Sequence, residues 1–353
     1  LNNSYMQCRK ASMKKYRTQE YGFDVINNNI SLQQDVRNST YKPLSTNDFI
    51  LSERGHKREI RAPKMRDRVI QKVLCKEVLI PLLRKYLIYD NGASLENKGV
   101  SFTRKRFLVH FRKAMKLWND FYVLKIDVKG YFANIDHEIL FGMMKNKIPE
   151  SVHCLFKTIS DSSGENGKGL SLGSEVPQIA ALLYLTPIDN YCKTVRQCKF
   201  YGRYMDDIYI MNNDKKFLND IKNEVKNELE KLKLEISERK TCVVKASKGV
   251  IFLQNDYIIK DGKIKIRPAK EKITRERRRL KKHKRLVENG EMTVTKATLC
   301  YKSWRGTILK DTKAKRTVNK MDKLFHSLFD NVPEIAIKPE REKIYFYDLE
   351  DEL

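Results

Sequence analysis

The chain has 353 residues, of which 41% are hydrophobic and 33% charged, and its 71 lysines and arginines against 44 aspartates and glutamates give a net charge of +27. No apolar run approaches the roughly 20 residues that span a bilayer, and no apolar signal segment opens the chain, so we expect no membrane partner. The cysteines are scattered along the chain, which favours a reducing cytoplasm. The 7 cysteines include no CxxC pair, which argues against a disulfide scaffold or a zinc site.

The positive charge is concentrated in parts of the chain. Residues 270–285, KEKITRERRRLKKHKR, are nearly all basic, whereas residues 348–353, DLEDEL, are acidic. Such an excess favours a polyanionic partner, with nucleic acid ahead of an acidic membrane. The alternative explanation is a generally lysine-rich proteome, but that would spread the positive charge evenly along the chain, and the charge is unevenly distributed. We expect the acidic tail to be disordered.

The first part of the chain predicts helices and two strands. Residues 1–45 are polar and asparagine-rich and predict short helices or a partly ordered lead-in. Residues 52–83 predict a short strand, a proline turn and then a helix. A loop rich in Gly, Asn and Ser is predicted for residues 90–105. Residues 121–136, FYVLKIDVKGYFANID, alternate in polarity as a strand does, and a helix capped by Asn134 or Asp136 should follow.

The middle of the chain predicts helices on either side of a hairpin. A glycine-rich loop leads into an apolar helix from about Pro177, which should kink or end near Pro187. Residues 200–210, FYGRYMDDIYI, predict a hairpin with a charged tip. An amphipathic helix is predicted over residues 218–232, where apolar side chains recur every three or four positions.

The last part predicts strands and then helices. Residues 248–268 predict strands with a turn at Asp261 and Gly262, and the remainder is helical and basic. The final apolar stripe is formed by Val318, Met321, Leu324, Phe325 and Leu328. Because strands and helices mix without regular βαβ alternation, the sequence predicts an α+β core followed by an all-helical segment.

Two adjacent aspartates, Asp206 and Asp207, lie at the tip of the predicted hairpin. Adjacent like charges repel and have to be hydrated or neutralised. Asp127 lies at the end of a predicted core strand, where a poorly hydrated carboxylate needs a cation. If this strand lies beside the hairpin, the carboxylates can hold two hard cations about 3.5–4 Å apart, as in phosphoryl-transfer sites. The alternative is that Asp127 caps the following helix and the pair solvates a turn.

Five sequence blocks occur in the order and spacing of the palm motifs of reverse transcriptases: KIDVKGYFANIDH, GSEVPQIAALLYL, YMDDIYI, ERKTC and GVIFLQNDYI. The chain therefore resembles this family from about Glu53 to Tyr257, and more loosely through the helices to Phe329. The resemblance implies an α+β right-hand polymerase. Its parts would be an N-terminal lead-in (1–50), fingers (51–120), a palm with interleaved fingers elements (121–258), a helical thumb (259–330) and a C-terminal tail (331–353).

The resemblance assigns the carboxylates to two Mg²⁺ ions, with Mn²⁺ as an alternative. Asp127 and Asp206 would hold ions that activate the primer 3′-hydroxyl and carry the incoming triphosphate, with Asp207 and Val128 at the metal edge. Lys240 matches the lysine that protonates the leaving pyrophosphate, although many surface lysines would look the same.

Four residues match the family's nucleotide-binding positions. Phe132 matches the steric gate against a ribose 2′-hydroxyl, with an ordinary core aromatic as the alternative. Gln178 matches the glutamine that contacts the nascent base pair or nucleotide. Arg58 is the main candidate for the triphosphate clamp, because a guanidinium can grip phosphate oxygens bidentately, and Lys64 is a weaker one.

A further group matches positions that contact the template and primer. Gln254 lies in the primer-grip turn, where the family usually has glycine, and the basic helix from Lys270 resembles a thumb that follows the backbone. A solvated charged face is the alternative for this helix. The candidates for nucleic-acid binding are Arg54, Gln254, Lys270, Arg277, Arg278 and Lys281.

The length and the segment YKSWRGTILKDTKAKRTVNKMDKLF most resemble bacterial reverse transcriptases of the diversity-generating type and their unclassified or defence-associated relatives. Pro177 stands where the diversity-generating enzymes usually have serine, which argues against targeted mutagenesis. The expected partners are an RNA template, a nucleic-acid primer, dNTPs, a cognate non-coding RNA and an accessory protein.

Two other classes of function are weighed against this one. An RNA-dependent RNA polymerase is disfavoured by the Phe132 gate, and a template-independent nucleotide polymerase is kept as an alternative. A non-catalytic RNA-binding palm protein is disfavoured because Asp127, Asp206 and Asp207 are all retained.

Overall fold

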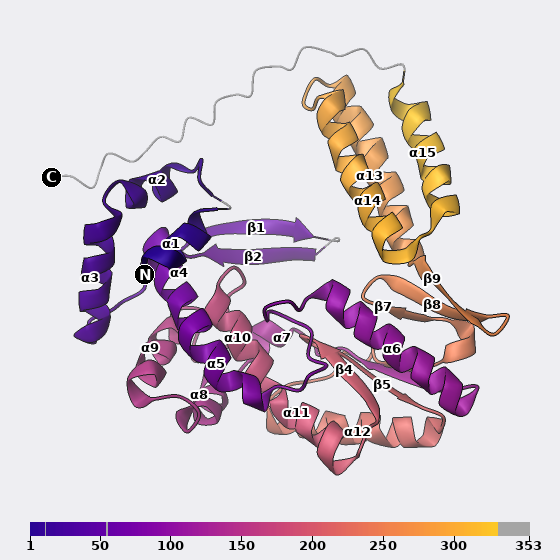
Figure 1. Cartoon of the computed structure of the whole chain (residues 1–353), viewed down its shortest axis with the longest axis horizontal. Helices are drawn as coiled ribbons and strands as arrows, with labels where there is room; N and C mark the ends of the chain where they lie inside the picture. Colours follow the sequence, from indigo (N-terminus) through magenta and orange to yellow (C-terminus); the bar gives the residue numbers. More distant parts are fainter. Residues whose placement is uncertain (11, 54–55, 331–353) are drawn as a thin grey trace. The chain divides into compact units, whose positions relative to one another are not determined.

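The computed structural model describes residues 1–10, 12–53 and 56–330 (Figure 1). Arg54 and the acidic C-terminal tail therefore lie outside the described residues. The chain divides into two compact units, one over Leu1–Lys245 and the other from Ala246 onward. The fold is α+β, as predicted. No helix within the described ranges has both the length and the apolar character needed to cross a membrane.

The first unit opens with three helices that all contact the helix α4. The predicted short helices at the N-terminus are present, and α1 contacts α4. A two-stranded antiparallel hairpin, β1–β2, follows in the chain. Its second strand corresponds to the strand predicted before the proline turn, whereas its first strand was not predicted. The elements are α1 (Asn2–Arg9), α2 (Tyr16–Phe23), α3 (Val25–Arg37), β1 (Asn47–Glu53), β2 (His56–Ala62), α4 (Met65–Val73), the π-helical η1 (Leu74–Leu79), α5 (Ile80–Leu83) and η2 (Arg84–Tyr86).

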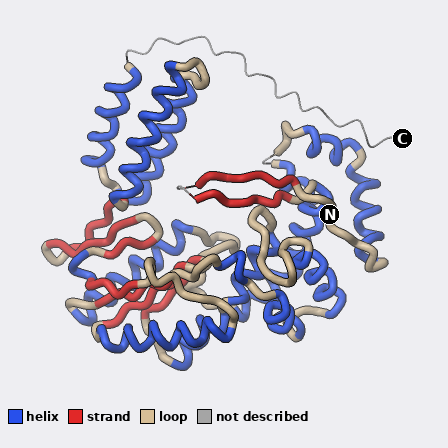
Figure 2. Tube along the Cα trace, turned by 180° about the vertical axis from the view of Figure 1, so that it is seen from behind, coloured by secondary structure: helices blue, strands red, loops and turns tan. Residues whose placement is uncertain are grey.

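A four-stranded antiparallel sheet in the order β4–β5–β3–β6 forms the centre of the first unit. Its strands are β3 (Tyr122–Ile126), β4 (Phe200–Tyr204), β5 (Asp207–Asn212) and β6 (Cys242–Lys245). Because successive side chains of a strand point to opposite faces, Ile208 and Ile210 face one way and Tyr209 the other. The isoleucines belong to the core that includes helix α12 (Lys215–Lys231), and Tyr209 packs on Phe107 of helix α6 (Val100–Trp118). The two helices thus cover opposite faces of the sheet (Figures 1 and 2).

Short helices connect β3 to β4. They are α7 (Tyr131–Asn134), α8 (His137–Lys145), α9 (Glu150–Asp161), α10 (Glu175–Tyr184), α11 (Thr186–Asn190) and the π-helical η3 (Tyr191–Val195). Of the two predicted caps, Asp136 is the one that caps α8, because its carboxylate accepts a hydrogen bond from the Ile139 N–H at 3.0 Å. Helix α10 ends two residues before Thr186–Pro187 opens α11, so the predicted break near Pro187 is confirmed.

The predicted loop over residues 90–105 is too long, because α6 begins at Val100. Its buried residues Thr103, Phe107, His110 and Ala114 recur at helical spacing. The first turn of the helix carries polar residues, which make it resemble the loop before it. Burial of the apolar face decides the conformation there.

Over residues 246–330, which the structure describes, the second unit contains a three-stranded antiparallel sheet and three α-helices. The elements are η4 (Ala246–Lys248), β7 (Val250–Phe252), β8 (Asn255–Lys260), β9 (Lys263–Pro268), α13 (Lys270–Glu288), α14 (Val294–Thr312) and α15 (Lys315–Phe329). The predicted turn at Asp261 and Gly262 joins β8 to β9, and both residues have positive φ. The helices share one core, in which Val318, Met321 and Phe325 of the predicted stripe are buried.

Candidate active site

Strand pairing brings the predicted carboxylates to one end of the central sheet. Ile126 of β3 pairs with Ile208 of β5, so the same register places Asp127 opposite Asp207. Asp127 does not cap the following helix, because the N-cap residue of α7 is Gly130. Its carboxylate is 15% exposed, and Asp206 and Asp207 are half-buried.

The register of β6 places Lys240 at the same end of the sheet. Lys125 of β3 pairs with Cys242, so Asp127 lies opposite Lys240. The Lys240 Nζ lies 3.3 and 3.2 Å from the Asp127 carboxylate oxygens. The Asp127 backbone N–H also donates to Thr241 Oγ1 at 3.3 Å. Four residues that the sequence analysis took from three separate motifs therefore meet at adjacent strand ends.

A tight turn presents Asp206. Tyr204 pairs with Asp207, so Met205 and Asp206 are the two central residues of the β4–β5 turn. Met205 has a φ of 53°. This left-handed conformation is uncommon for a residue other than glycine, and strained backbone of this kind gathers at functional sites.

The electrostatics of the turn are unfavourable for an ionised Asp206. Burial raises the pKa of the Asp206 carboxyl to about 6, and the charges of Asp207 and Asp127 add to the effect. Lys240 and a backbone hydrogen bond lower this pKa, but they do not cancel the increase. The charges of the neighbouring carboxylates therefore oppose ionisation of Asp206, and Lys240 supplies a counter-charge beside them.

The donor set fits divalent cations of the Mg²⁺ class. Carboxylate oxygens are the hard ligands that Mg²⁺ prefers, and a bound cation would relieve the repulsion at Asp206. Within the described ranges, no three or more His, Cys, Asp or Glu side chains already form a metal-binding group. The fit therefore rests on the chemistry and adjacency of the carboxylates. Val128 follows Asp127 and is buried.

Gln178 lies at the one half-buried position between Val176 and Tyr184 of α10, whose other residues in this stretch are buried. Its side-chain oxygen Oε1 accepts a hydrogen bond from Ser94 Oγ at 3.0 Å. Ser94 belongs to the loop before α6. This bond leaves the amide nitrogen of Gln178 to donate elsewhere.

Phe132 is half-buried in α7, with its ring centroid 5.6 Å from that of Tyr131. Tyr131 OH donates to the Ala181 carbonyl of α10, which ties α7 to the helix that carries Gln178. The steric-gate assignment of Phe132 and its alternative as a core aromatic both agree with partial burial.

The candidates for the triphosphate clamp lie on other elements. Arg58 is an exposed residue of β2, where it pairs with Leu51. Lys64 is the N-cap residue of α4. These positions are separate from the strand ends that carry the carboxylates.

The nucleic-acid candidates of the second unit divide between a turn and a helix. Leu253 and Gln254 join β7 to β8 with φ of 43° and 68°. Since two-residue hairpin turns with positive φ favour glycine, this geometry explains why glycine is common at the Gln254 position. Lys270, Arg277, Arg278 and Lys281 are all exposed on α13.

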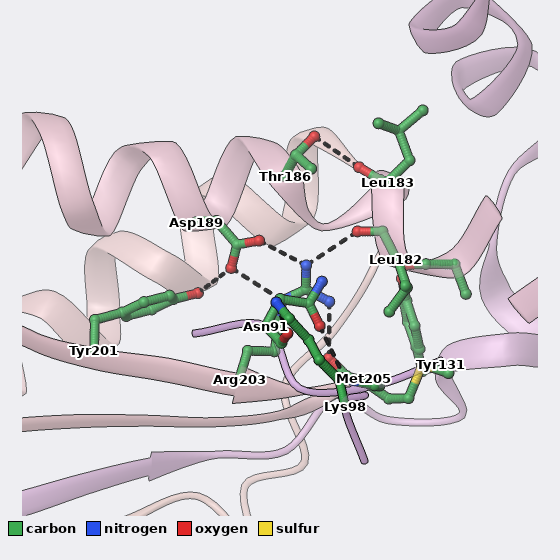
Figure 3. Close-up of polar contacts among 12 residues, drawn as sticks. Asn91, Lys98, Tyr131, Leu182, Leu183, Thr186, Asp189, Tyr201, Arg203 and Met205 are labelled. Atoms are coloured by element: carbon green, nitrogen blue, oxygen red, sulfur yellow. Dashed lines mark hydrogen bonds and ion pairs between the residues drawn. The ribbon is translucent and has the colours of Figure 1, made fainter. Parts of the chain in front are cut away.

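The sequence analysis did not identify a buried ion pair behind the Met205–Asp206 turn (Figure 3). Arg203 and Asp189 are both 0% exposed. Arg203 Nε donates to Asp189 Oδ1 at 2.9 Å and Nη2 donates to Oδ2 at 2.6 Å. Tyr201 OH also donates to Asp189 Oδ1, at 2.6 Å. An arginine inside an aromatic strand segment is the sequence signal that could have revealed it.

Comparison with known proteins identifies relatives of this arrangement. A family model described as "Reverse transcriptase (RNA-dependent DNA polymerase)" matches residues 46–256. No curated protein matches the sequence. Telomerase from Candida albicans, solved with a TWJ fragment of telomeric RNA, has a TM-score of 0.50 at 11% identity, over 80% of this chain and 55% of that one. Apo telomerase from Candida tropicalis has a TM-score of 0.49 at 13% identity, over 86% and 64%. At 11% identity the likeness to the Candida albicans structure shows the fold alone. This chain spans less than two thirds of either of those chains.

Proposed function

Because the chain belongs to the reverse transcriptase family, we propose that it is an RNA-directed DNA polymerase that extends a primer hydroxyl with dNTPs. The observation that carries this proposal is the strand pairing on both sides of β3. That pairing sets Asp127 beside the Asp206–Asp207 turn and beside Lys240. A protein that only bound RNA would not need carboxylates on adjacent strand ends, where they repel one another and the phosphates.

The carboxylates would hold the divalent ions that reverse transcriptase domains generally use. When bound, two such ions supply activation of the primer 3′-hydroxyl and stabilisation of the charge on the triphosphate. Asp127 and Asp206 would be the main ligands of these ions, with Asp207 and Val128 beside them. Lys240, whose Nζ lies 3.2 Å from the Asp127 carboxylate, would give a proton to the leaving pyrophosphate.

The remaining site residues would select and position the nucleotide. The Gln178 amide, oriented by Ser94, would contact the nascent base pair. The half-buried Phe132 ring would exclude a ribose 2′-hydroxyl, and Arg58 and Lys64 would bind the triphosphate. Arg54, which lies outside the described residues, remains a candidate for contact with nucleic acid.

The domain assignment follows the same proposal. Fingers (51–120) and most of the palm (121–258) fall within the first compact unit, Leu1–Lys245. The β7–β8 turn with Gln254 and the three helices of the thumb (259–330) fall within the second. The exposed cations of α13 would follow the backbone of the template and primer.

For biological role, we propose a bacterial retroelement or phage-defence system with a cognate non-coding RNA and an accessory protein. The support is the resemblance of the segment from Tyr301 to Phe325 to diversity-generating and related enzymes. Sequencing nucleic acid that copurifies from the native host tests this, because a single abundant structured RNA is expected and a random sample of cellular RNA would contradict it.

Primer extension tests the activity. Wild-type protein should extend a DNA primer on an RNA template with Mg²⁺ and dNTPs, whereas Asp206→Asn and Asp207→Asn should not. Asp220→Asn, at an exposed position of α12, is the matched control and should remain active. Incorporation of NTPs in preference to dNTPs would support the RNA polymerase alternative, and Phe132→Ala should shift the wild-type preference towards NTPs.

A further inference from the structure

The Arg203–Asp189 ion pair is fully buried, and burying two charges costs free energy. A role beyond stability would explain why it is present. A guanidinium and a carboxylate removed from water are stable only when each is paired and hydrogen-bonded. Burial by itself lowers the pKa of the Arg203 guanidinium, but the charge and hydrogen bonds of Asp189 outweigh burial and keep this pKa above its usual value. Arg203 is thus a fixed cation whose planar fork has a single orientation.

The other donors of Arg203 join two structural elements. Nη2 donates to the Leu182 carbonyl at 3.0 Å, in the last turn of α10. Nη1 donates to the Met205 carbonyl at 3.1 Å, in the turn that presents Asp206. As Figure 3 shows, the guanidinium lies between these carbonyls and Asp189. One rigid group therefore links helix α10 to the β4–β5 turn.

The end of α10 provides the acceptor that Arg203 uses. The last carbonyls of a helix lack internal partners. Pro187 has no N–H to donate to the Leu183 carbonyl four residues earlier, and Thr186 Oγ1 donates to that carbonyl instead, at 2.7 Å. The neighbouring Leu182 carbonyl accepts from Arg203. Gln178 lies one helical turn before Leu182, so the same contact fixes the part of α10 that carries it.

The contact at Met205 acts directly on Asp206. A peptide unit is planar, so the Met205 carbonyl and the Asp206 N–H move together. Met205 has a positive φ, which a methionine would leave in the absence of restraint. The bond from Arg203 therefore holds the peptide that sets the direction of the Asp206 side chain.

The backbone of Arg203 is hydrogen-bonded to the loop whose residue Ser94 contacts Gln178. Its N–H donates to the Asp90 carbonyl at 3.0 Å, and its carbonyl accepts from the Gly92 N–H at 3.0 Å. Two residues further on, Ser94 donates to Gln178. Arg203 is thus connected to Gln178 from both sides, through α10 and through this loop.

We propose that Arg203 is a positioning residue that fixes the Met205–Asp206 peptide relative to α10, so that the cation ligand Asp206 and the nucleotide-contacting Gln178 keep one separation. Asp189 holds the guanidinium in the required orientation. This inference rests on the proposed function, since it concerns the same carboxylates. It differs from a purely structural role, in which loss of the pair would lower stability and leave cation binding by the folded protein unchanged.

The test compares Arg203→Lys with Tyr201→Phe. Lysine can still pair with Asp189, but its single Nζ cannot also bond the Leu182 and Met205 carbonyls. Tyr201→Phe removes a hydrogen bond to the same Asp189 and leaves every contact of Arg203 in place. Both variants disturb one buried network, so their midpoints of thermal unfolding are the measure of structural damage.

The quantity measured is the affinity of the full chain for Mn²⁺ in the absence of nucleic acid, determined by electron paramagnetic resonance. Binding by Asp206→Asn is subtracted, so that only the Asp206-dependent site is counted. We expect Arg203→Lys to weaken this binding about 10-fold or more, as for other residues that orient metal ligands, and Tyr201→Phe to change it less than about two-fold. In primer extension, Arg203→Lys should raise the half-saturating Mg²⁺ concentration by a similar factor.

Three results would overturn the inference. If both folded variants bind Mn²⁺ as wild type does, Arg203 is structural and the proposed function stands. If the two variants weaken binding equally and in proportion to their loss of stability, the effect is again structural. If wild type shows no Asp206-dependent binding, both the inference and the proposed function fail. If Arg203→Lys does not fold, Asp189→Asn provides the same comparison. Asparagine keeps the side-chain shape but weakens the two hydrogen bonds that orient the Arg203 guanidinium.

Discussion

Replacing Asp206 by asparagine should stabilise the metal-free protein, although it abolishes the proposed activity. The pKa of the Asp206 carboxyl is about 6, against a usual value of 3.8, because of burial and the neighbouring carboxylates. A carboxyl whose pKa is higher in the folded chain than in the unfolded chain destabilises the fold when it ionises. Its contribution is fully favourable below pH 3.8 and is lost as the pH rises through about 6.

The magnitude follows from the same values. At about 1.4 kcal/mol for each pH unit, the difference corresponds to about 3 kcal/mol at pH 7. Water reaches a half-buried carboxylate, so we expect Asp206→Asn to raise the free energy of unfolding by about 1–3 kcal/mol. Near pH 4 the gain should largely disappear.

The assay is urea unfolding in EDTA at pH 7 and pH 4. The two tryptophans fall in different units, so a Trp304→Phe background leaves Trp118, which contacts Phe121 and Phe200, to report on the first unit. Asp220→Asn controls for loss of one negative charge from a chain of net charge +27. The reasoning is refuted if Asp206→Asn is less stable than wild type at pH 7, or if its gain matches that of Asp220→Asn.

Other changes should act on separate parts of the site. Ser94→Ala removes the hydrogen bond that orients Gln178. In single-nucleotide insertion it should raise the KM for dNTPs and the rate of misincorporation more than it lowers kcat, and unchanged selectivity between correct and incorrect dNTPs would contradict this role of Ser94. Lys240→Ala removes the ammonium beside Asp127. Mn²⁺ should therefore bind more tightly, while primer extension becomes slower. Weaker Mn²⁺ binding would show that Lys240 and the cation do not compete for the Asp127 carboxylate. Replacing Arg277, Arg278 and Lys281 by glutamine should reduce the slope of log affinity against log salt by about 2 to 3 for a duplex, and an unchanged slope would exclude their contact with phosphates.

The sequence predicted those parts of the fold that depend on local patterns. Alternation around Leu124 and Ile208 predicted the strands, and the turn residues Asp261 and Gly262 predicted the last hairpin. Carboxylates at the ends of apolar strands were recognisable for the same reason, because burial makes an unpaired charge costly wherever the strands pair. The predictions of the individual roles of these residues remain to be tested.

Contacts between distant segments could not be predicted in the same way. Asp189 and Arg203 lie on different elements, and nothing in either segment alone indicates that the two charges meet in the core. Ser94 and Gln178 are 84 residues apart in the sequence, and their bond depends on a loop whose course is set by Arg203. The start of α6 was misplaced because the polar residues Ser101, Thr103, Arg104 and Lys105 lie in its first two turns, and tertiary burial of Phe107 overrides that signal.

The most direct test of the account is primer extension on an RNA template by wild type, Asp206→Asn and Asp220→Asn, measured side by side with Mg²⁺ and dNTPs. The account predicts template-dependent DNA synthesis by wild type and Asp220→Asn, and none by Asp206→Asn. Equal synthesis by all three proteins would show that the Asp127–Asp206–Asp207 site is not the catalytic centre.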